Sequence, residues 1–207
     1  MPATLIADVV GSRKHGAGAE LFLQLQPILD KVNERTSPLQ PLTFTIGDEI
    51  QGIYDSVASA IRASLLIHLL TAPVELRVGI GFGDVLQTSV SVRPFGQTGE
   101  GWWLARDALT FVEREQSPKL LRTIRTAIRH SDATIEQALN GWLVLRDHLL
   151  SRMDATDRSI TTDLLEDTPQ FRIAESLAVD PAAISRRVQR SGARQIVWAQ
   201  LELERAV

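Results

Sequence analysis

The fold is decided by two short stretches, Leu5-Ile6-Ala7-Asp8-Val9-Val10-Gly11-Ser12 and Phe44-Thr45-Ile46-Gly47-Asp48-Glu49-Ile50, in which a carboxylate follows an apolar run. A buried aspartate is costly without a partner, and a shared divalent cation is one such partner. Mg²⁺ is commonly held by one or two carboxylates, with waters and phosphates completing its shell. Either aspartate alone is more often a cap for a neighbouring turn or helix. The pair predicts a site for Mg²⁺ or Mn²⁺ at Asp8 and Asp48.

Strand and helix patterns alternate around these two stretches. Apolar runs predict strands over residues 4–10, 42–46, 50–54 and 74–82, and amphipathic periodicity predicts helices over 17–35 and 57–70. The resulting β-α-β-β-α-β order is typical of a ferredoxin-like fold, in which both helices cover one face of an antiparallel sheet. The first half is therefore expected to be an α+β domain.

Helical periodicity dominates from Gly101 onward. Helices are predicted over residues 102–115, 118–130, 134–153 and 157–166. We expect a ferredoxin-like domain over 1–125, a helical connector over 126–167 and an all-α region over 168–207.

Composition excludes several classes of protein. The 207 residues are 44% hydrophobic, which is enough for a core, and contain no cysteine, so disulfides, zinc thiolate sites and thiol nucleophiles are excluded. No apolar run approaches the roughly 20 residues of a membrane helix, and no leader pattern opens the chain, so a cytoplasmic protein without a membrane partner is expected. The net charge is −3, yet residues 168–207 hold 6 Lys and Arg against 4 Asp and Glu. A nucleic acid would dock there.

The same basic segment has the pattern of a helix-turn-helix between Phe171 and Val188. Asp180 is a favourable N-cap and Pro181 a favourable first helical residue, so a helix is predicted to begin there. Ala178 stands where the turn requires a left-handed residue. Ala174 is expected where the two helices touch, with a shared core of Leu177, Val179, Ile184 and Val188.

The second helix would dock in the major groove of double-stranded DNA. The residues expected to face bases or their flanks are Ala182, Ala183, Ser185, Arg186 and Gln189, and those expected to contact phosphates are Arg187, Arg190 and Arg194. The alternative is a helical pair that only packs a homodimer, with its arginines in solvent.

The N-terminal half resembles the catalytic domain of class III nucleotide cyclases. The matching segments are Asp8-Val9-Val10-Gly11-Ser12, Thr45-Ile46-Gly47-Asp48, residues 76–85 and residues 99–106. The resemblance implies metal binding by Asp8 and Asp48 and nucleotide binding at Ser12, Gly47 and Arg106.

This chain departs from the cyclase pattern at catalytic positions. The base-selecting lysine aligns with Phe44, the ribose-orienting asparagine with Trp103, and the arginine that follows it with Asp107, although Arg106 is one position away. Since phosphoryl transfer depends on positioned donors, these departures predict binding without turnover and no catalytic residues.

A closer resemblance, over essentially the whole chain, is to SatD family proteins. It rests on Asp8-Val9-Val10-Gly11-Ser12-Arg13 and Thr45-Ile46-Gly47-Asp48-Glu49-Ile50-Gln51-Gly52, followed by a helical C-terminal half. We therefore predict a dimeric DNA-binding regulator with a degenerate cyclase-like sensor domain for a nucleotide or metal. The alternatives are a Mg²⁺- or Mn²⁺-dependent cyclase or related enzyme acting on nucleoside triphosphates, and a module that makes only protein contacts.

Overall fold

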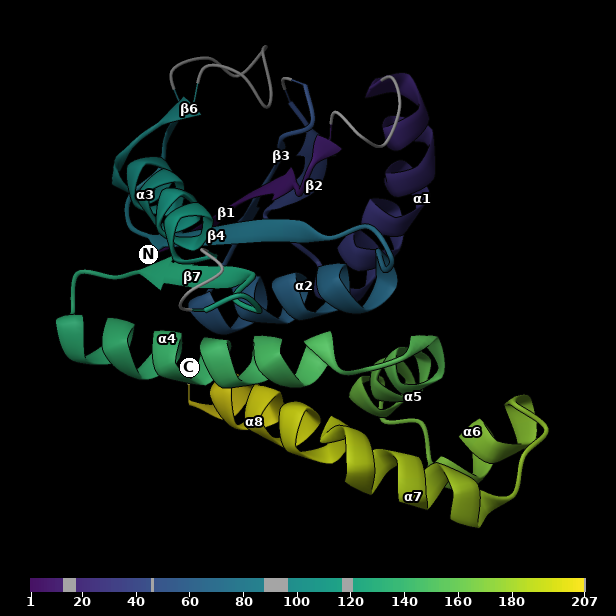
Figure 1. The fold of residues 1–207 in the computed structure, drawn as a ribbon. Helices are drawn as coiled ribbons and strands as arrows, with labels where there is room; N and C mark the ends of the chain where they lie inside the picture. Colours follow the sequence, from purple (N-terminus) through teal and green to yellow (C-terminus); the bar gives the residue numbers. More distant parts are fainter. Residues whose placement is uncertain (13–17, 46, 88–96, 117–120, 207) are drawn as a thin grey trace.

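The structure is a computed structural model that describes residues 1–12, 18–45, 47–87, 97–116 and 121–206 (Figure 1). Its strands are β1 (Ala3–Val9), β2 (Gln40–Phe44), β3 (Ile50–Tyr54), β4 (Leu76–Phe82), β5 (Leu86–Gln87), β6 (Gln97–Thr98) and β7 (Thr126–Arg129). Its helices are α1 (Gly18–Thr36), α2 (Val57–Leu70), α3 (Glu100–Glu115), α4 (Ala133–Ser151), α5 (Ala155–Leu165), α6 (Gln170–Ser176), α7 (Pro181–Ser191) and α8 (Ala193–Arg205). The α+β class predicted from the sequence is confirmed.

A five-stranded sheet in the order β2-β3-β1-β4-β7 organises the N-terminal half. Strand β1 pairs antiparallel with both β3 and β4, and β7 pairs parallel with β4. Up to Phe82 the elements follow the expected β-α-β-β-α-β order. The register sets Ala7 opposite Ile50 and Asp8 opposite Arg77, so the C-terminal end of β1 meets the start of β3 and of β4.

The helix predicted over residues 118–130 is wrong, because Thr126–Arg129 is strand β7. Residues 118–120 lie outside the described part of the chain. Pairing with β4 overrides the local helical pattern, and it buries Ala127 and Ile128 in the protein. The predicted connector therefore begins with a strand of the main sheet, while the proposed domain boundaries stay a prediction.

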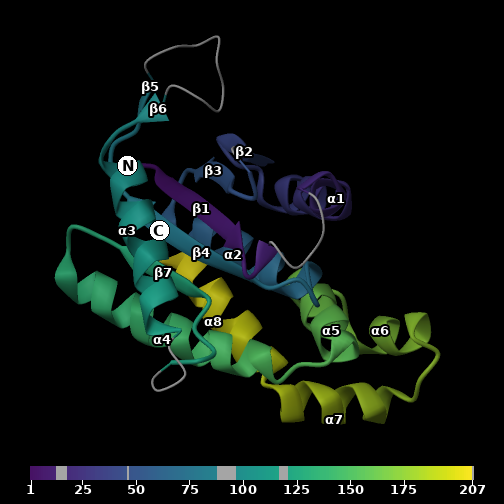
Figure 2. The ribbon, with the colours of Figure 1, turned by 45° about the horizontal axis from the view of Figure 1, so that its top comes forward.

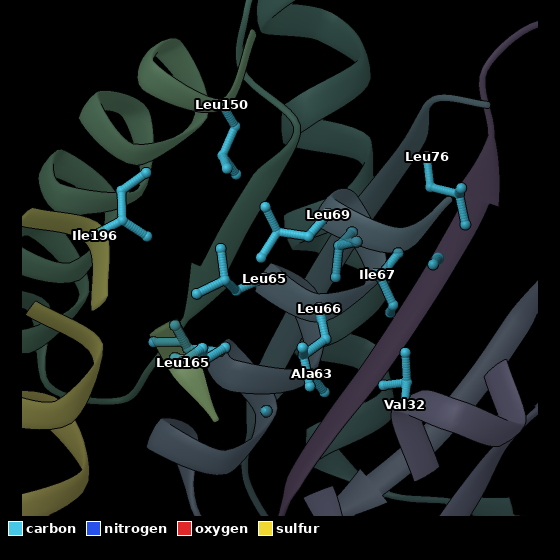
Figure 3. Packing of buried hydrophobic residues seen from close by; sticks show 14 of the residues in the cluster. Val32, Ala63, Leu65, Leu66, Ile67, Leu69, Leu76, Leu150, Leu165 and Ile196 are labelled. Atoms are coloured by element: carbon cyan, nitrogen blue, oxygen red, sulfur yellow. The ribbon is translucent and has the colours of Figure 1, made fainter. Parts of the chain in front are cut away.

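Helix α3 covers one face of the sheet, and α1 and α2 lie on the other (Figure 2). One hydrophobic cluster runs from the α1 and α2 face into the C-terminal helices. Figure 3 shows Leu65 and Leu69 of α2 close to Leu150 of α4 and Ile196 of α8. The C-terminal helices therefore pack directly on α2 and share its core.

Helix α3 approaches β4 closely because the strand has glycines on the side facing the helix. A Cβ atom on Gly79 would overlap the backbone oxygen of Ala105, and one on Gly81 would overlap that of Gly101. These glycines therefore serve helix–sheet packing. Val78 and Ile80, on the opposite side of the same strand, are in the core cluster.

Helices α6 and α7 form where the helix-turn-helix pattern predicts them, at an end of the molecule away from the β5–β6 hairpin (Figures 1 and 2). Asp180 caps α7 by accepting a hydrogen bond from the backbone N–H of Ala182 at 2.9 Å, and Ala178 has a φ of 52°. Ile184 and Val188 are buried as expected. Val179 was wrongly placed in the shared core: it is 43% exposed, because it lies in the turn before α7.

No helix in the described part of the chain combines the length and the apolar character needed to cross a membrane.

Candidate metal and nucleotide site

The C-terminal end of β1 directs Asp8 toward α3, because side chains alternate along a strand. Leu5, Ala7 and Val9 belong to the core on the other face, whereas Ile6 packs on the α3 side. Asp8 is thus placed on the α3 side of the central strand, next to β3 and β4.

Arg77 on β4 links Asp8 to helix α3. Its Nη1 donates to Asp8 Oδ2 at 3.2 Å and to Glu113 Oε1 at 3.3 Å, and its Nε donates to Gln116 Oε1 at 2.7 Å. Charge-assisted hydrogen bonds of this kind fix the side chains that make them. One oxygen of Asp8 is therefore held by a guanidinium.

The other oxygen of Asp8 has no hydrogen-bond partner among the described residues. Oδ1 is buried and makes no hydrogen bond with any residue that the structure describes. Burial raises the pKa of Asp8 to about 6 against the opposing effect of Arg77, and the charges of Glu113 and Asp48 contribute to the rise. At neutral pH the site therefore holds a poorly solvated carboxylate, which a cation would stabilise.

Asp48 lies in the turn between β2 and β3, close enough for its charge to raise the pKa of Asp8. Gly47 before it has a φ of 68°, a left-handed conformation that glycine adopts without strain. Ser12, the other predicted ligand-binding residue of this end of the sheet, is partly buried after β1. Ile46 and Arg13, which belong to the two sequence motifs, lie outside the described residues.

Arg106 is bound by the acidic hairpin. Its Nη1 donates to Glu49 Oε2 at 2.7 Å and its Nη2 to Glu49 Oε1 at 2.8 Å, and this pairing raises the pKa of Arg106. A bidentate pair of this kind holds the hairpin against α3. The predicted nucleotide-binding arginine thus lies beside the acidic cluster with its guanidinium on Glu49.

Electrostatic interactions join Asp8, Asp48, Glu49 and Glu113 with Arg77 and Arg106 in one cluster. Four carboxylates against two guanidiniums leave a formal charge of −2 when all are ionised. Within the described ranges no group of three or more His, Asp or Glu side chains could hold a metal ion by itself. Any cation here would depend on one or two carboxylates and on oxygens from water or a ligand.

The three departures from the cyclase pattern are packing or surface positions. Phe44 packs on Phe22, with ring centroids 5.3 Å apart. Trp103 is 69% exposed, whereas its neighbour Trp102 is buried, and Asp107 accepts from Arg129 Nε at 3.0 Å. Apart from the indole N–H of Trp103, these positions supply no side-chain donor for a phosphate.

Two arginines of α7, Arg187 and Arg190, form ion pairs with aspartates at the start of α5. Arg187 donates to Asp154 and Asp157 at 2.9 and 2.7 Å, and Arg190 donates to Asp157 at 3.2 Å. The remaining predicted DNA contacts differ in exposure: Ala183 and Ser185 are partly buried, and Ala182, Arg186, Gln189 and Arg194 are exposed. The exposed face of α7 therefore carries Ala182, Arg186, Gln189 and Arg190, whereas Arg194 lies in α8.

The sequence prediction missed a buried ionic network under β7. Asp147 Oδ2 accepts from the backbone N–H groups of Arg125 and Thr126, both at 2.7 Å, and its Oδ1 accepts from Arg146 at 2.9 Å. Burial raises the pKa of Asp147 and lowers that of His68 well below 6.5. One feature of the sequence could have predicted this network. Arg146 and Asp147 share a helix face with Leu143 and Leu150, so two charged side chains stand on a face that is otherwise apolar.

Comparison with known proteins assigns the family. The model of the SatD family matches residues 3–200. The chain belongs to the SatD family. No curated protein matches it.

Two solved structures are similar to parts of this SatD family protein. A bacterial light-regulated adenylyl cyclase is 14% identical with a TM-score of 0.42, over 60% of this chain and 73% of the other. The guanylyl cyclase Cya2 is 17% identical with a TM-score of 0.36, over 56% of this chain and 70% of the other.

Proposed function

We propose that this SatD family protein binds a divalent cation, Mg²⁺ or Mn²⁺, together with a nucleotide at Asp8 and Asp48. The observation that carries the proposal is the buried Oδ1 of Asp8, which has no partner among the described residues. A buried carboxylate oxygen without a hydrogen bond is costly, and a cation removes that cost.

The charge of the site supports the same ligand. A divalent cation balances the formal charge of −2 around Asp8, and hard cations prefer carboxylate oxygens. Asp8 and Asp48 would hold the ion, and the ion would supply positive charge for the phosphates of a nucleotide. The turns at Ser12 and Gly47 lie at the same end of the sheet and would position those phosphates.

Phe44, Trp103 and Asp107 support binding without turnover. A phosphoryl-transfer site requires preorganised donors around the reacting phosphorus. Asp107 instead carries a negative charge and pairs with Arg129. We therefore propose a sensor in preference to a cyclase.

Calorimetric titration with ATP and GTP, each with Mg²⁺ or Mn²⁺, tests this proposal. We expect binding that requires the cation, with affinity falling at least about tenfold in Asp8→Asn and Asp48→Asn. The exposed Asp55, changed to Asn, is the matched control and should bind as the wild type does. Absence of binding would refute the sensor, and release of pyrophosphate that depends on Asp48 would establish the enzyme instead.

A second proposed function is DNA binding by α7, favoured by its capped start and by the exposed Arg186 and Gln189. Arg186→Ala should relax sequence preference by roughly 1–3 kcal/mol if it contacts a guanine. Arg194→Ala should weaken binding to all sequences and reduce the log–log salt slope by about 0.9. Fluorescence anisotropy with duplex DNA measures both effects, and no binding at low salt would leave α6 and α7 as an assembly element.

A further inference from the structure

A hollow lies on the opposite face of the sheet from Asp8. It has a volume of about 380 Å³, opens to solvent on one side and is lined by the end of α2, the start of β4, the end of α4 and the start of α5. Its apolar wall includes Leu76, Leu150 and Met153, and its polar wall includes Arg125 and Arg158. The volume is within the range of small-molecule sites.

Arg158 differs from the other charged residues of this cavity because its guanidinium is held by backbone oxygens and not by a carboxylate. Its Nη1 donates to the backbone oxygen of His68 at 2.6 Å and its Nη2 to that of Leu150 at 2.8 Å. No carboxylate of the described chain lies within ion-pair distance of it; burial lowers the pKa of Arg158, and the charge of Glu75 opposes that shift. A guanidinium has five N–H donors, so Arg158 retains donors for a ligand.

The other charges of the cavity are already balanced. Arg125 Nη2 pairs with Glu75 Oε2 at 2.7 Å, and Asp147 pairs with Arg146 at 2.9 Å. His68 is neutral at physiological pH because burial and nearby guanidiniums keep its pKa low. Among the described residues, Arg158 therefore contributes one positive charge that no carboxylate balances in an ion pair.

We propose that this cavity binds a small monoanion with an apolar body, namely a carboxylate on a hydrocarbon chain or ring. The carboxylate pairs with Arg158, and the hydrocarbon part lies against Leu76, Leu150 and Met153. Charge-assisted hydrogen bonds and burial of apolar surface both favour this ligand. The site is separate from the one proposed at Asp8.

Isothermal titration of the full chain with octanoate at pH 7.5 tests the proposal, with octanamide as the uncharged probe of the same shape. We expect octanoate to bind at least about tenfold more tightly than octanamide, because only the carboxylate gains a charge-assisted pair. Arg158→Gln should weaken octanoate binding by a similar factor. Arg152→Gln, an exposed arginine at the end of α4, and Asp8→Asn should leave it unchanged.

A second variant keeps the test decisive if Arg158→Gln fails to fold. Ala155 lines the cavity at the exposed start of α5, so Ala155→Trp should fill the space and abolish octanoate binding while thermal unfolding stays cooperative. No binding of octanoate by the wild type at tens of millimolar would overturn the proposal. Equal binding of octanamide, or unchanged binding by a folded Ala155→Trp protein, would also overturn it.

Discussion

At the residue scale, Asp8 makes stability depend on pH. Its folded pKa is about 6 against 3.8 for the free group, so the protonated form is favoured by folding. The resulting destabilisation is absent below pH 3.8, grows as pH rises through 6, and is complete above it. Discounted for the solvent that still reaches the side chain, this destabilisation is about 2–3 kcal/mol.

Asp8→Asn should therefore raise the free energy of unfolding in metal-free buffer by about 2–3 kcal/mol at pH 7.5 and leave it almost unchanged at pH 4. Urea denaturation in EDTA at both pH values measures the difference, with Asp55→Asn as the control. Destabilisation by Asp8→Asn at pH 7.5 would contradict the assignment, because it would mean that the ion pair with Arg77 outweighs the burial of Asp8.

The buried Arg146 and Asp147 pair gives a second prediction at this scale. Both side chains have no exposed surface, so Asp147→Ala leaves a guanidinium without its counter-charge. The expected loss is about 3–5 kcal/mol, measured by urea denaturation. The double variant Arg146→Met with Asp147→Leu should lose clearly less than Asp147→Ala, and an equal or larger loss would contradict an electrostatic origin.

The sequence predicted individual residues well where their chemistry is local. Asp180 caps α7 and Ala178 is left-handed as expected, because both depend on the backbone of the same turn. The partners of Asp8 could not be predicted, since Arg77 and Glu113 reach it only after β4 and α3 have packed. The Arg187 pair with Asp157 also joins residues far apart in the sequence.

At the element scale, β7 shows where the local sequence pattern fails to predict secondary structure. Residues 126–129 carry a helix-compatible sequence, and only the free edge of β4 selects the strand. The seven-residue β1 and the hairpin strands were recognisable because each is an apolar run ended by a turn residue.

The packing of α3 on β4 predicts that replacing two glycines with alanine has opposite effects on stability. Gly79→Ala should destabilise the protein by about 3 kcal/mol or more, because its Cβ would meet the backbone of α3, which cannot move aside. Gly141→Ala, in the middle of α4 with nothing near the new Cβ, should stabilise by up to about 1 kcal/mol. Thermal unfolding measures both, and equal small effects would contradict close packing of α3.

The contact between α5 and α7 gives another prediction. Asp157 is 4% exposed at its side chain and accepts from Arg187 and Arg190, so Asp157→Asn should cost about 1–2 kcal/mol on thermal unfolding. If α7 binds DNA, the freed arginines should also tighten binding and steepen its salt dependence. Weaker DNA binding by a folded variant would indicate that the pair positions α7.

At the scale of the whole molecule, one core cluster reaches from β1 to α8, so the sheet and the C-terminal helices share their packing. The proposed cation site, the Arg158 cavity and the exposed face of α7 surround that core. Sequence patterns predicted the order of strands and helices up to β4, and the metal site at Asp8 and Asp48 stays a prediction. They did not predict the cavity, because its walls come from α2, β4, α4 and α5.

The most direct test of the cation site is a titration of Mn²⁺ followed by the electron paramagnetic resonance signal of the free ion. At pH 7.5 we expect about one Mn²⁺ bound per chain, with affinity reduced at least about tenfold in Asp8→Asn and Asp48→Asn but kept in Asp55→Asn. Binding should weaken at pH 5, because protons then occupy Asp8, whose pKa is about 6. Failure of the wild type to bind Mn²⁺, or equal binding by Asp8→Asn, would contradict the proposed site.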